Sequence, residues 1–163
     1  MPHLTIIIGG AASGKSTYAE ALTIKTGRPK VYLATAQAYD AEMEAKIRDH
    51  QVDRGDGWTT IEAPLDVVSA MSRQSADAVV LLDCATMWLS NVMMTDQDLA
   101  AETDHLLAGL RDAPCPVVVV TNEVGMGIVP DNALSRQFRN AQGRLNQRLA
   151  AQADTVITVI AGL

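Results

Sequence analysis

Four residues near the amino terminus have types and a spacing that suit phosphate chemistry. The pattern G-x-x-x-x-G-K-[ST] is met by Gly9, Gly14, Lys15 and Ser16. Such a loop wraps a phosphate so closely that successive backbone N–H groups point at it, and glycine allows the close approach. Lys15 can reach the outer phosphates, and the Ser16 hydroxyl is placed to hold Mg²⁺. The alternative interpretation is a chance match in a tight strand-to-helix turn.

The residues on either side of this loop are those that a phosphate-binding loop needs. The apolar run from Leu4 to Ile8 predicts a strand, and the stretch from Thr17 to Leu22 predicts a helix. The N-terminal N–H groups and the positive dipole end of that helix would add to the phosphate site. A second apolar run, from Ala78 to Asp83, ends in a carboxylate. This is the form of a Walker-B strand, in which the acid faces the Mg²⁺ held by Ser16.

Strands and helices alternate along the rest of the chain. Further strands are predicted over Lys30–Ala36, Trp58–Glu62, Pro116–Glu123 and Thr155–Ile160. Further helices are predicted from Asp40 through His50 to Arg54, over Leu65–Ser72, over Asp98–Leu110, and along the stripe from Leu134 to Leu149. This alternation predicts an α/β fold of the P-loop NTPase type, with a doubly wound, mainly parallel sheet flanked by helices.

Polar residues stand at the ends of several predicted strands. They are Thr35, Glu62, Asp83, Asn122 and Glu123. Because ligands of such sheets bind at the carboxyl ends of the strands, we expect these residues to gather around the P-loop. Four arginines lie off the apolar stripe of the last predicted helix: Arg136, Arg139, Arg144 and Arg148. They could meet a phosphate, although such a pattern is more typical of a solvated helix face.

Composition limits the class of protein. The 163 residues predict one domain, residues 1–163, and the apolar runs fall far short of the ~18 residues that a membrane span needs. A net charge of −6 argues against a broad nucleic-acid surface. The amino terminus lacks an export signal, so we expect a cytoplasmic protein without membrane insertion. Cys84 and Cys115 each adjoin a buried-strand candidate and are expected to be core residues.

Several segments go beyond what a generic nucleotide-binding domain requires, and together they resemble one family. They are Gly9–Ser16, Tyr32–Ala36, Asp40–Met43 leading to His50 and Trp58, Leu82–Cys84 with Trp88–Asn91, Thr121–Pro130, Phe138-Arg139 and Gly143–Gln147. The chain resembles, nearly end to end, the bifunctional adenosylcobinamide kinase and adenosylcobinamide-phosphate guanylyltransferase of cobalamin biosynthesis.

The resemblance implies two reactions. An NTP, either ATP or GTP, phosphorylates the aminopropanol hydroxyl of adenosylcobinamide. GTP then donates GMP to that phosphate through a histidine, which corresponds to His50, and adenosylcobinamide-GDP and pyrophosphate are released. A neutral imidazole can attack the α-phosphorus, and Arg54 lies about one helical turn away. On the residues alone, a half-buried histidine at a helix end is an equal alternative for His50.

The resemblance also implies the site residues, a cofactor and an assembly. Lys15 and His50 are catalytic, and Ser16 and Asp83 hold Mg²⁺. The nucleotide site comprises Gly9, Gly10, Ala11, Ala12, Ser13, Gly14, Lys15, Ser16, Ala34, Thr35, Ala36, Gln51, Val52, Asp53, Arg54, Glu62 and Asp83. Ala12 stands where many family members have an arginine, and Asp83 where some have a glutamate. Family members assemble as homotrimers, so we expect a homo-oligomer that takes a corrinoid and an NTP.

Two other functions fit the P-loop and the acid-tipped strand. A simple small-molecule kinase would transfer only the γ-phosphate, with His50 in a structural role. A nucleotide-dependent regulatory module would show nucleotide-dependent partner binding and no chemistry on a corrinoid. The segment from Asp40 to Trp58 favours the bifunctional transferase over both.

Overall fold

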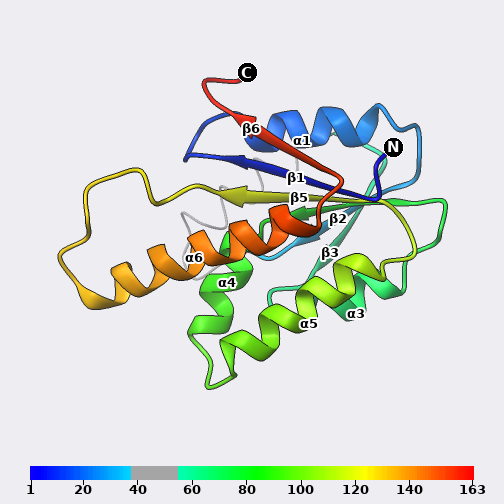
Figure 1. The fold of residues 1–163 in the computed structure, drawn as a ribbon. Coiled ribbons are helices and arrows are strands. Elements are labelled where there is room, and N and C mark those ends of the chain that lie inside the picture. Colours follow the sequence, from blue (N-terminus) through cyan, green and yellow to red (C-terminus); the bar gives the residue numbers. More distant parts are fainter. Residues whose placement is uncertain (38–54) are drawn as a thin grey trace.

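A computed structural model describes residues 1–37 and 55–163 of the chain. Within that part, six strands form one sheet: β1 (Leu4–Gly9), β2 (Lys30–Ala34), β3 (Trp58–Glu62), β4 (Val79–Asp83), β5 (Val117–Asn122) and β6 (Thr155–Val159). Their order across the sheet is β3-β2-β4-β5-β1-β6, and every neighbouring pair is parallel (Figure 1). The predicted parallel α/β sheet is therefore confirmed.

The central strands are apolar because both of their faces are covered. In β5 the side chains of Val117 and Val119 join the core on one face of the sheet, whereas Val118 and Val120 join the core on the other. All four valines are fully buried. Such a run of branched residues suits a strand in the middle of a parallel sheet, where no position faces water.

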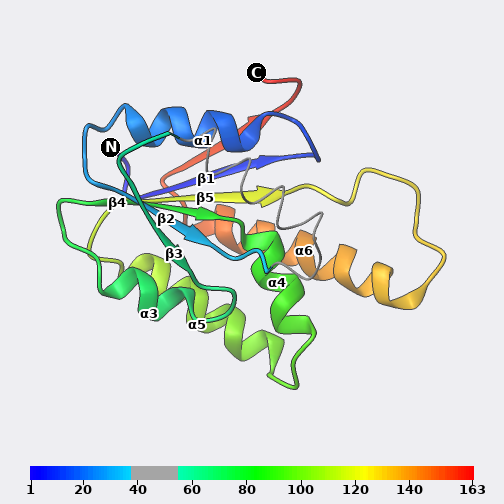
Figure 2. The ribbon, with the colours of Figure 1, turned by 180° about the vertical axis from the view of Figure 1, so that it is seen from behind.

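The helices are divided unequally between the two faces (Figures 1 and 2). The described helices are α1 (Lys15–Ile24), α3 (Val67–Ser72), α4 (Ala85–Met93), α5 (Leu99–Arg111) and α6 (Ala133–Gln152). Among the helices of residues 1–37 and 55–163, only α1 lies on one face, where Ala19 packs against the core that contains Ile7 and Leu81. The other four cover the opposite face and bury Trp88 and Leu106 in the larger core.

Some element boundaries differ from those that the sequence predicts. Strand β2 ends at Ala34 rather than Ala36, because Thr35 turns towards the β4–α4 junction. Helices α3 and α5 begin after Asp66 and Asp98, whose carboxylates accept hydrogen bonds from the first turn of each helix. The helix predicted from Asp40 lies outside the described residues.

Helix α4 is an element that the sequence patterns did not predict. Its residues are buried on more than one side, including Ala85, Thr86, Trp88, Leu89, Asn91 and Val92. A helix with this burial has no polar stripe, so the periodicity that identifies surface helices is absent. Its N-cap is Cys84, whose Sγ accepts a hydrogen bond from Met87 N at 3.4 Å, and cysteine is not a residue that marks helix starts.

Both cysteines are buried and free, as expected of core residues. Burial, and to a smaller extent the neighbouring Asp83 carboxylate, raises the pKa of the Cys84 thiol to about 11. Among the helices that the structure describes, none is both long and apolar enough to cross a membrane.

Candidate nucleotide-binding site

The loop between β1 and α1 has the backbone conformation that the motif predicts. Gly14 caps α1 with a φ of 91°, which is a left-handed conformation that favours glycine. Ala12 also adopts a left-handed φ, of 53°. Lys15 folds back over the loop, and its Nζ donates to Gly10 O at 3.1 Å. The ammonium group therefore lies above the loop, where it can exchange this carbonyl for a phosphate oxygen.

The loop is packed from behind by the end of the chain. Gly162 N donates to Ser13 O at 2.8 Å, and a Cβ placed on Gly14 would lie 3.0 Å from Gly162 Cα. A Cβ on Gly9 would lie 2.4 Å from Ser13 Oγ and 2.6 Å from Val159 O. Gly9 is required because these contacts leave no room for a side chain. Strand β6 and the residues after it thus fix the shape of the loop.

Strand β5 lies between the P-loop strand and the acid-tipped strand. In register, Gly9 pairs with Asn122, and Asp83 pairs with Val120. Asp83 is therefore two strands from the P-loop strand, roughly 10 Å at the usual spacing of neighbouring strands. Its Oδ2 accepts a hydrogen bond from the hydroxyl of Tyr32 at 3.0 Å, which orients the carboxylate.

A buried hydrogen-bond network fixes the carboxyl end of β5 against α4 and α6. Thr86 Oγ1 accepts from Asn122 N at 2.8 Å, and Asn146 Nδ2 donates to Asn122 O at 3.0 Å. Gln142, which is fully buried, donates from Nε2 to Thr121 Oγ1 at 2.9 Å and to Asn146 Oδ1 at 2.8 Å. Both backbone polar groups of Asn122 are satisfied in this way, so its position beside the P-loop is well determined.

Two buried polar atoms beside the P-loop lack a protein partner in the described part of the chain. They are Ser13 Oγ and Asn122 Oδ1. Buried polar atoms are nearly always hydrogen-bonded, so unpaired ones at a carboxyl edge indicate a place where a ligand or water completes the bonding. The edge therefore has the character of a ligand site and not merely of a turn between two elements.

The oxygen atoms at this edge fit Mg²⁺. Ser16 at the start of α1 offers a hydroxyl, and Asp83 offers a carboxylate at the end of β4. Among residues 1–37 and 55–163, no cluster of three or more His, Cys, Asp or Glu side chains could hold a metal ion. A hydroxyl and a carboxylate are ligand types that suit Mg²⁺, since it usually takes one or two protein oxygens and completes its shell with phosphates and water.

A second group of hydrogen bonds joins the ends of β2 and β4. Thr35 is fully buried; its Oγ1 donates to Cys84 O and accepts from Cys84 N, both at 2.8 Å. Asn91 Nδ2 donates to Thr35 O at 2.8 Å and to Pro64 O at 2.9 Å. The Thr35 side chain therefore holds the turn that follows Asp83.

The structure brings some of the predicted site residues together and leaves others apart. The loop residues from Gly9 to Ser16 lie at one edge with Asp83. Ala34, which ends β2, and the following Thr35 and Ala36 lie at the same edge. Glu62 ends the outermost strand, with β2, β4 and β5 between it and β1, so it does not gather at the P-loop as expected. The predicted residues His50, Gln51, Val52, Asp53 and Arg54 lie outside the described residues.

The segment that follows β5 makes contacts that the sequence patterns did not predict. Arg139 Nη2 donates to Gly125 O at 2.6 Å, and Arg136 Nη1 donates to Pro130 O at 2.9 Å. These two arginines therefore hold the loop in place rather than forming only a solvated face. Met126 and Ile128 in this loop are 93% and 97% exposed. The loop projects beyond the sheet at its carboxyl edge (Figure 1).

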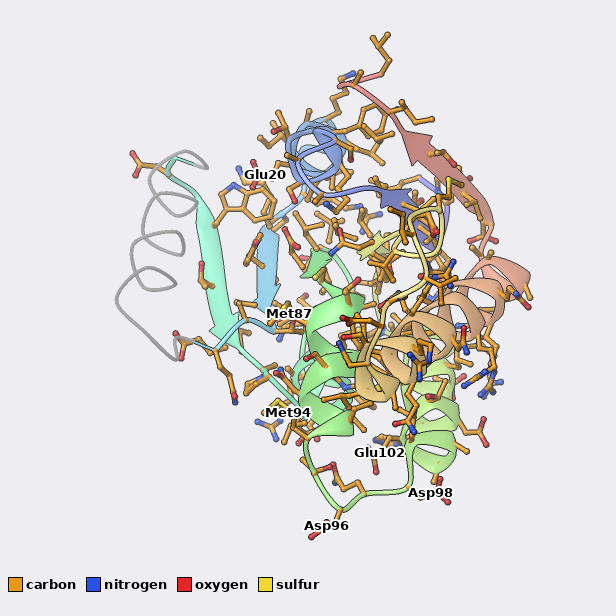
Figure 3. All side chains as sticks on the ribbon, turned by 90° about the vertical axis from the view of Figure 1, so that its left-hand side faces the viewer. Glu20, Met87, Met94, Asp96, Asp98 and Glu102 are labelled. Atoms are coloured by element: carbon orange, nitrogen blue, oxygen red, sulfur yellow. The ribbon has the colours of Figure 1, made fainter. Side chains whose placement is uncertain are left out.

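Figure 3 looks onto the carboxyl edge and shows how the elements surround it. Helix α1 lies on one side of the sheet, and α4 and α6 lie on the other. Met87 marks the end of α4 that is near the sheet, and Met94 marks its far end. Side chains from both layers therefore border the same edge.

This fold and this edge define the chain as a P-loop protein that uses nucleoside triphosphates. The family model of cobinamide kinase / cobinamide phosphate guanyltransferase, CobU, matches residues 5–163. The chain belongs to this family. The resemblance that the sequence motifs predicted is confirmed.

Two named relatives align with this chain over nearly the whole length of both proteins. The chain is 40% identical over 161 residues to the bifunctional adenosylcobalamin biosynthesis protein CobP of Pseudomonas aeruginosa, covering 97% of this chain and 93% of that one. It is 38% identical over 176 residues to the corresponding CobU of Escherichia coli K12, covering 98% and 97%.

A more distant solved structure supports the fold alone. The crystal structure of the RadB recombinase superposes with a TM-score of 0.51 at 19% identity, covering 86% of this chain and 71% of that one.

Proposed function

We propose that this protein phosphorylates the aminopropanol hydroxyl of adenosylcobinamide with an NTP and then transfers GMP from GTP to the resulting phosphate. The products are adenosylcobinamide-GDP and pyrophosphate. Membership of the family across residues 5–163 carries this proposal, since the family model unites a kinase and a guanyltransferase in one chain. The names of the two relatives, each a bifunctional adenosylcobalamin biosynthesis protein, support the same pair of reactions.

The P-loop residues take the roles of phosphate binding and charge neutralisation in this proposal. Backbone N–H groups of the loop hold the β- and γ-phosphates, and the Lys15 ammonium moves from Gly10 O to a phosphate oxygen. Ser16 and Asp83 would hold Mg²⁺, which would neutralise charge on the departing phosphate groups. The positive end of α1 adds to this field. Phosphoryl transfer needs little more than positioning and such charge stabilisation.

His50 is the proposed carrier of GMP. In the first half of the transfer, an imidazole nitrogen attacks the α-phosphorus, and the bond to the bridging oxygen of pyrophosphate breaks. In the second half, a phosphate oxygen of adenosylcobinamide phosphate attacks the same phosphorus and the bond to His50 breaks. The histidine thereby divides one difficult displacement into two easier ones.

The breadth of the carboxyl edge supports an extended nucleotide in the transfer reaction. The P-loop lies at the end of β1, Ala34–Ala36 lie at the end of β2, and Glu62 ends β3. A GTP whose outer phosphates lie in the P-loop would run across β5 and β4 towards β2 and β3. At that end the Glu62 carboxylate can accept hydrogen bonds from N1–H and N2–H of guanine.

We also propose that the protein forms a homotrimer and works in the cytoplasm, where its nucleotide substrates are made. Exposed Met126, Ile128 and Leu134, at 93%, 97% and 70%, support a surface that another subunit covers. Light scattering on the purified protein distinguishes a trimer from a monomer or dimer.

Covalent labelling tests the proposed transfer. The protein is incubated with Mg²⁺ and GTP labelled at the α-phosphate or, in parallel, at the γ-phosphate. We expect an acid-labile, base-stable adduct from the α-label alone, absent in His50→Asn. Folded wild-type protein that forms no α-adduct would exclude the histidine carrier and leave a simple kinase.

A further inference from the structure

A carboxylate stands directly after β5, beside the P-loop. Glu123 N donates to Gly9 O at 3.0 Å, so the backbone of Glu123 is bonded to the first glycine of the loop. Since β5 and β1 are neighbours, their axes lie about 4.8 Å apart. Glu123 thus lies at the end of the site where the P-loop would bind phosphates, although the G-x-x-x-x-G-K-[ST] motif does not include it.

The Glu123 side chain is held in one orientation. Its Oε1 accepts a hydrogen bond from Gly125 N at 2.5 Å. A Cβ on Gly125 would lie 2.8 Å from that oxygen, so a side chain there would displace the carboxylate from its present position. Arg139 holds the other side of Gly125 through its carbonyl. Oε2, in contrast, makes no hydrogen bond within residues 1–37 and 55–163. One oxygen is fixed and the other remains available to a substrate.

The other carboxylates at the carboxyl edge are less suited to take a proton near the γ-phosphate. Asp83 Oδ2 already accepts a hydrogen bond from the Tyr32 hydroxyl, and the carboxylate is the proposed ligand of Mg²⁺. Glu62 ends β3, four strand spacings from β1, or about 19 Å. Among the described strand ends, Glu123 is the carboxylate beside the P-loop strand.

We propose that Glu123 is the general base of the kinase step. This proposal rests on the function proposed above. The hydroxyl oxygen of the corrinoid substrate attacks the γ-phosphorus while its proton passes to Oε2 of Glu123. The bond between the γ-phosphorus and the β–γ bridging oxygen breaks, and the nucleoside diphosphate leaves with that electron pair. The carboxyl group then returns its proton to water.

The same residue has no proton to remove in guanylyl transfer. The first nucleophile of that reaction is a neutral imidazole nitrogen, and the second is a phosphate oxygen that is already ionised. Loss of the Glu123 carboxylate should therefore slow the kinase step and leave the rate of guanylyl transfer unchanged.

The test uses the full-length protein with two separate substrates. Adenosylcobinamide with GTP and Mg²⁺ reports the kinase step, and adenosylcobinamide phosphate with GTP reports the transferase. Glu123→Gln keeps an oxygen that can accept from Gly125 N but cannot take the proton. We expect its kinase kcat to fall by roughly 10²–10⁴-fold, the usual contribution of a general base, with guanylyl transfer within about threefold of wild type.

Two further variants separate a base from a structural role. Gly125→Ala keeps the charge of Glu123 but displaces its carboxylate, and should lower kinase kcat while sparing guanylyl transfer. Asp131→Asn removes an exposed charge from the same loop and should change neither rate.

The outcomes are distinct. An equal loss of both activities in Glu123→Gln would show that Glu123 only supports nucleotide binding, and an unchanged kinase rate would show that it is not the base. Either result overturns the proposal. A wild-type protein that phosphorylates no adenosylcobinamide would instead refute the proposed function.

Discussion

The strongest stability prediction concerns Thr35, whose hydroxyl joins the ends of β2 and β4. Thr35→Val replaces the hydroxyl by a methyl group of similar size at a fully buried position. Cys84 N then loses its hydrogen-bond partner, and Cys84 O keeps only the bond from Trp88 N. Leaving a buried N–H unpaired costs about 1–3 kcal/mol, and losing one of two bonds to a carbonyl costs about 1 kcal/mol. The free energy of unfolding should therefore fall by about 2–4 kcal/mol.

Thr35→Ser is the matched control because it keeps both hydrogen bonds and removes one methyl group. That loss should cost only about 1 kcal/mol. Urea unfolding of the nucleotide-free protein, followed by circular dichroism, measures the free energy of unfolding of both variants. In thermal unfolding, the Tm of Thr35→Val should fall by roughly 10 °C. If Thr35→Val is as stable as Thr35→Ser, the hydroxyl does not hold this edge and the reasoning is refuted.

Three more predictions follow from the geometry. Gly9→Ala should lower Tm and abolish the nucleotide binding that calorimetry measures, because its Cβ would lie 2.6 Å from a backbone oxygen. Gly10→Ala has open space around its Cβ and should keep the Tm of wild type. Gln142→Ala should lower the free energy of unfolding by about 2–4 kcal/mol in urea, because it breaks the buried network behind β5; a loss under about 1 kcal/mol would contradict this. In the folded protein the Cys84 thiol has a pKa of about 11 and stays neutral below it, whereas the unfolded thiol ionises near its ordinary value of about 9. The free energy of unfolding should therefore be constant below about pH 9 and fall as the pH rises towards 11. Two units correspond to about 3 kcal/mol, and Cys84→Ala should flatten the pH dependence of unfolding by that amount.

The P-loop and the parallel sheet could be predicted because their signals are local. Gly14 needs its left-handed backbone angle whatever surrounds it, and the run of valines in β5 has no polar face wherever the strand lies. The apolar strands and the glycine-lysine motif therefore carry the fold class and the phosphate chemistry in the sequence itself.

The order of the strands could not be read in the same way. Local patterns did not predict that β5 lies between β1 and β4, nor that Glu62 lies at the far side of the sheet. Both follow from which strands pair, and pairing depends on contacts distant in sequence. We therefore expected all the polar residues at strand ends to lie around the P-loop, whereas in the structure they lie at different places along the carboxyl edge of the sheet.

The roles of residues that act through tertiary hydrogen bonds could also not be predicted from the sequence. Arg139 has the spacing of an exposed residue on a helix, yet its guanidinium bonds the carbonyl of Gly125, which in turn holds Glu123. Helix α4 lacks a polar stripe because most of its residues are buried. The polar residues that cap and bridge these elements reveal their partners only in the folded chain.

Product analysis with adenosylcobinamide and GTP tests directly whether one chain carries out both reactions. Purified protein is given adenosylcobinamide, GTP and Mg²⁺, and mass spectrometry follows the corrinoid over time. We predict that adenosylcobinamide phosphate appears first and is then converted to adenosylcobinamide-GDP with release of pyrophosphate, and that Lys15→Ala forms neither product. Accumulation of the phosphate alone would contradict the two-reaction account, and an unchanged corrinoid would contradict the assignment of the substrate.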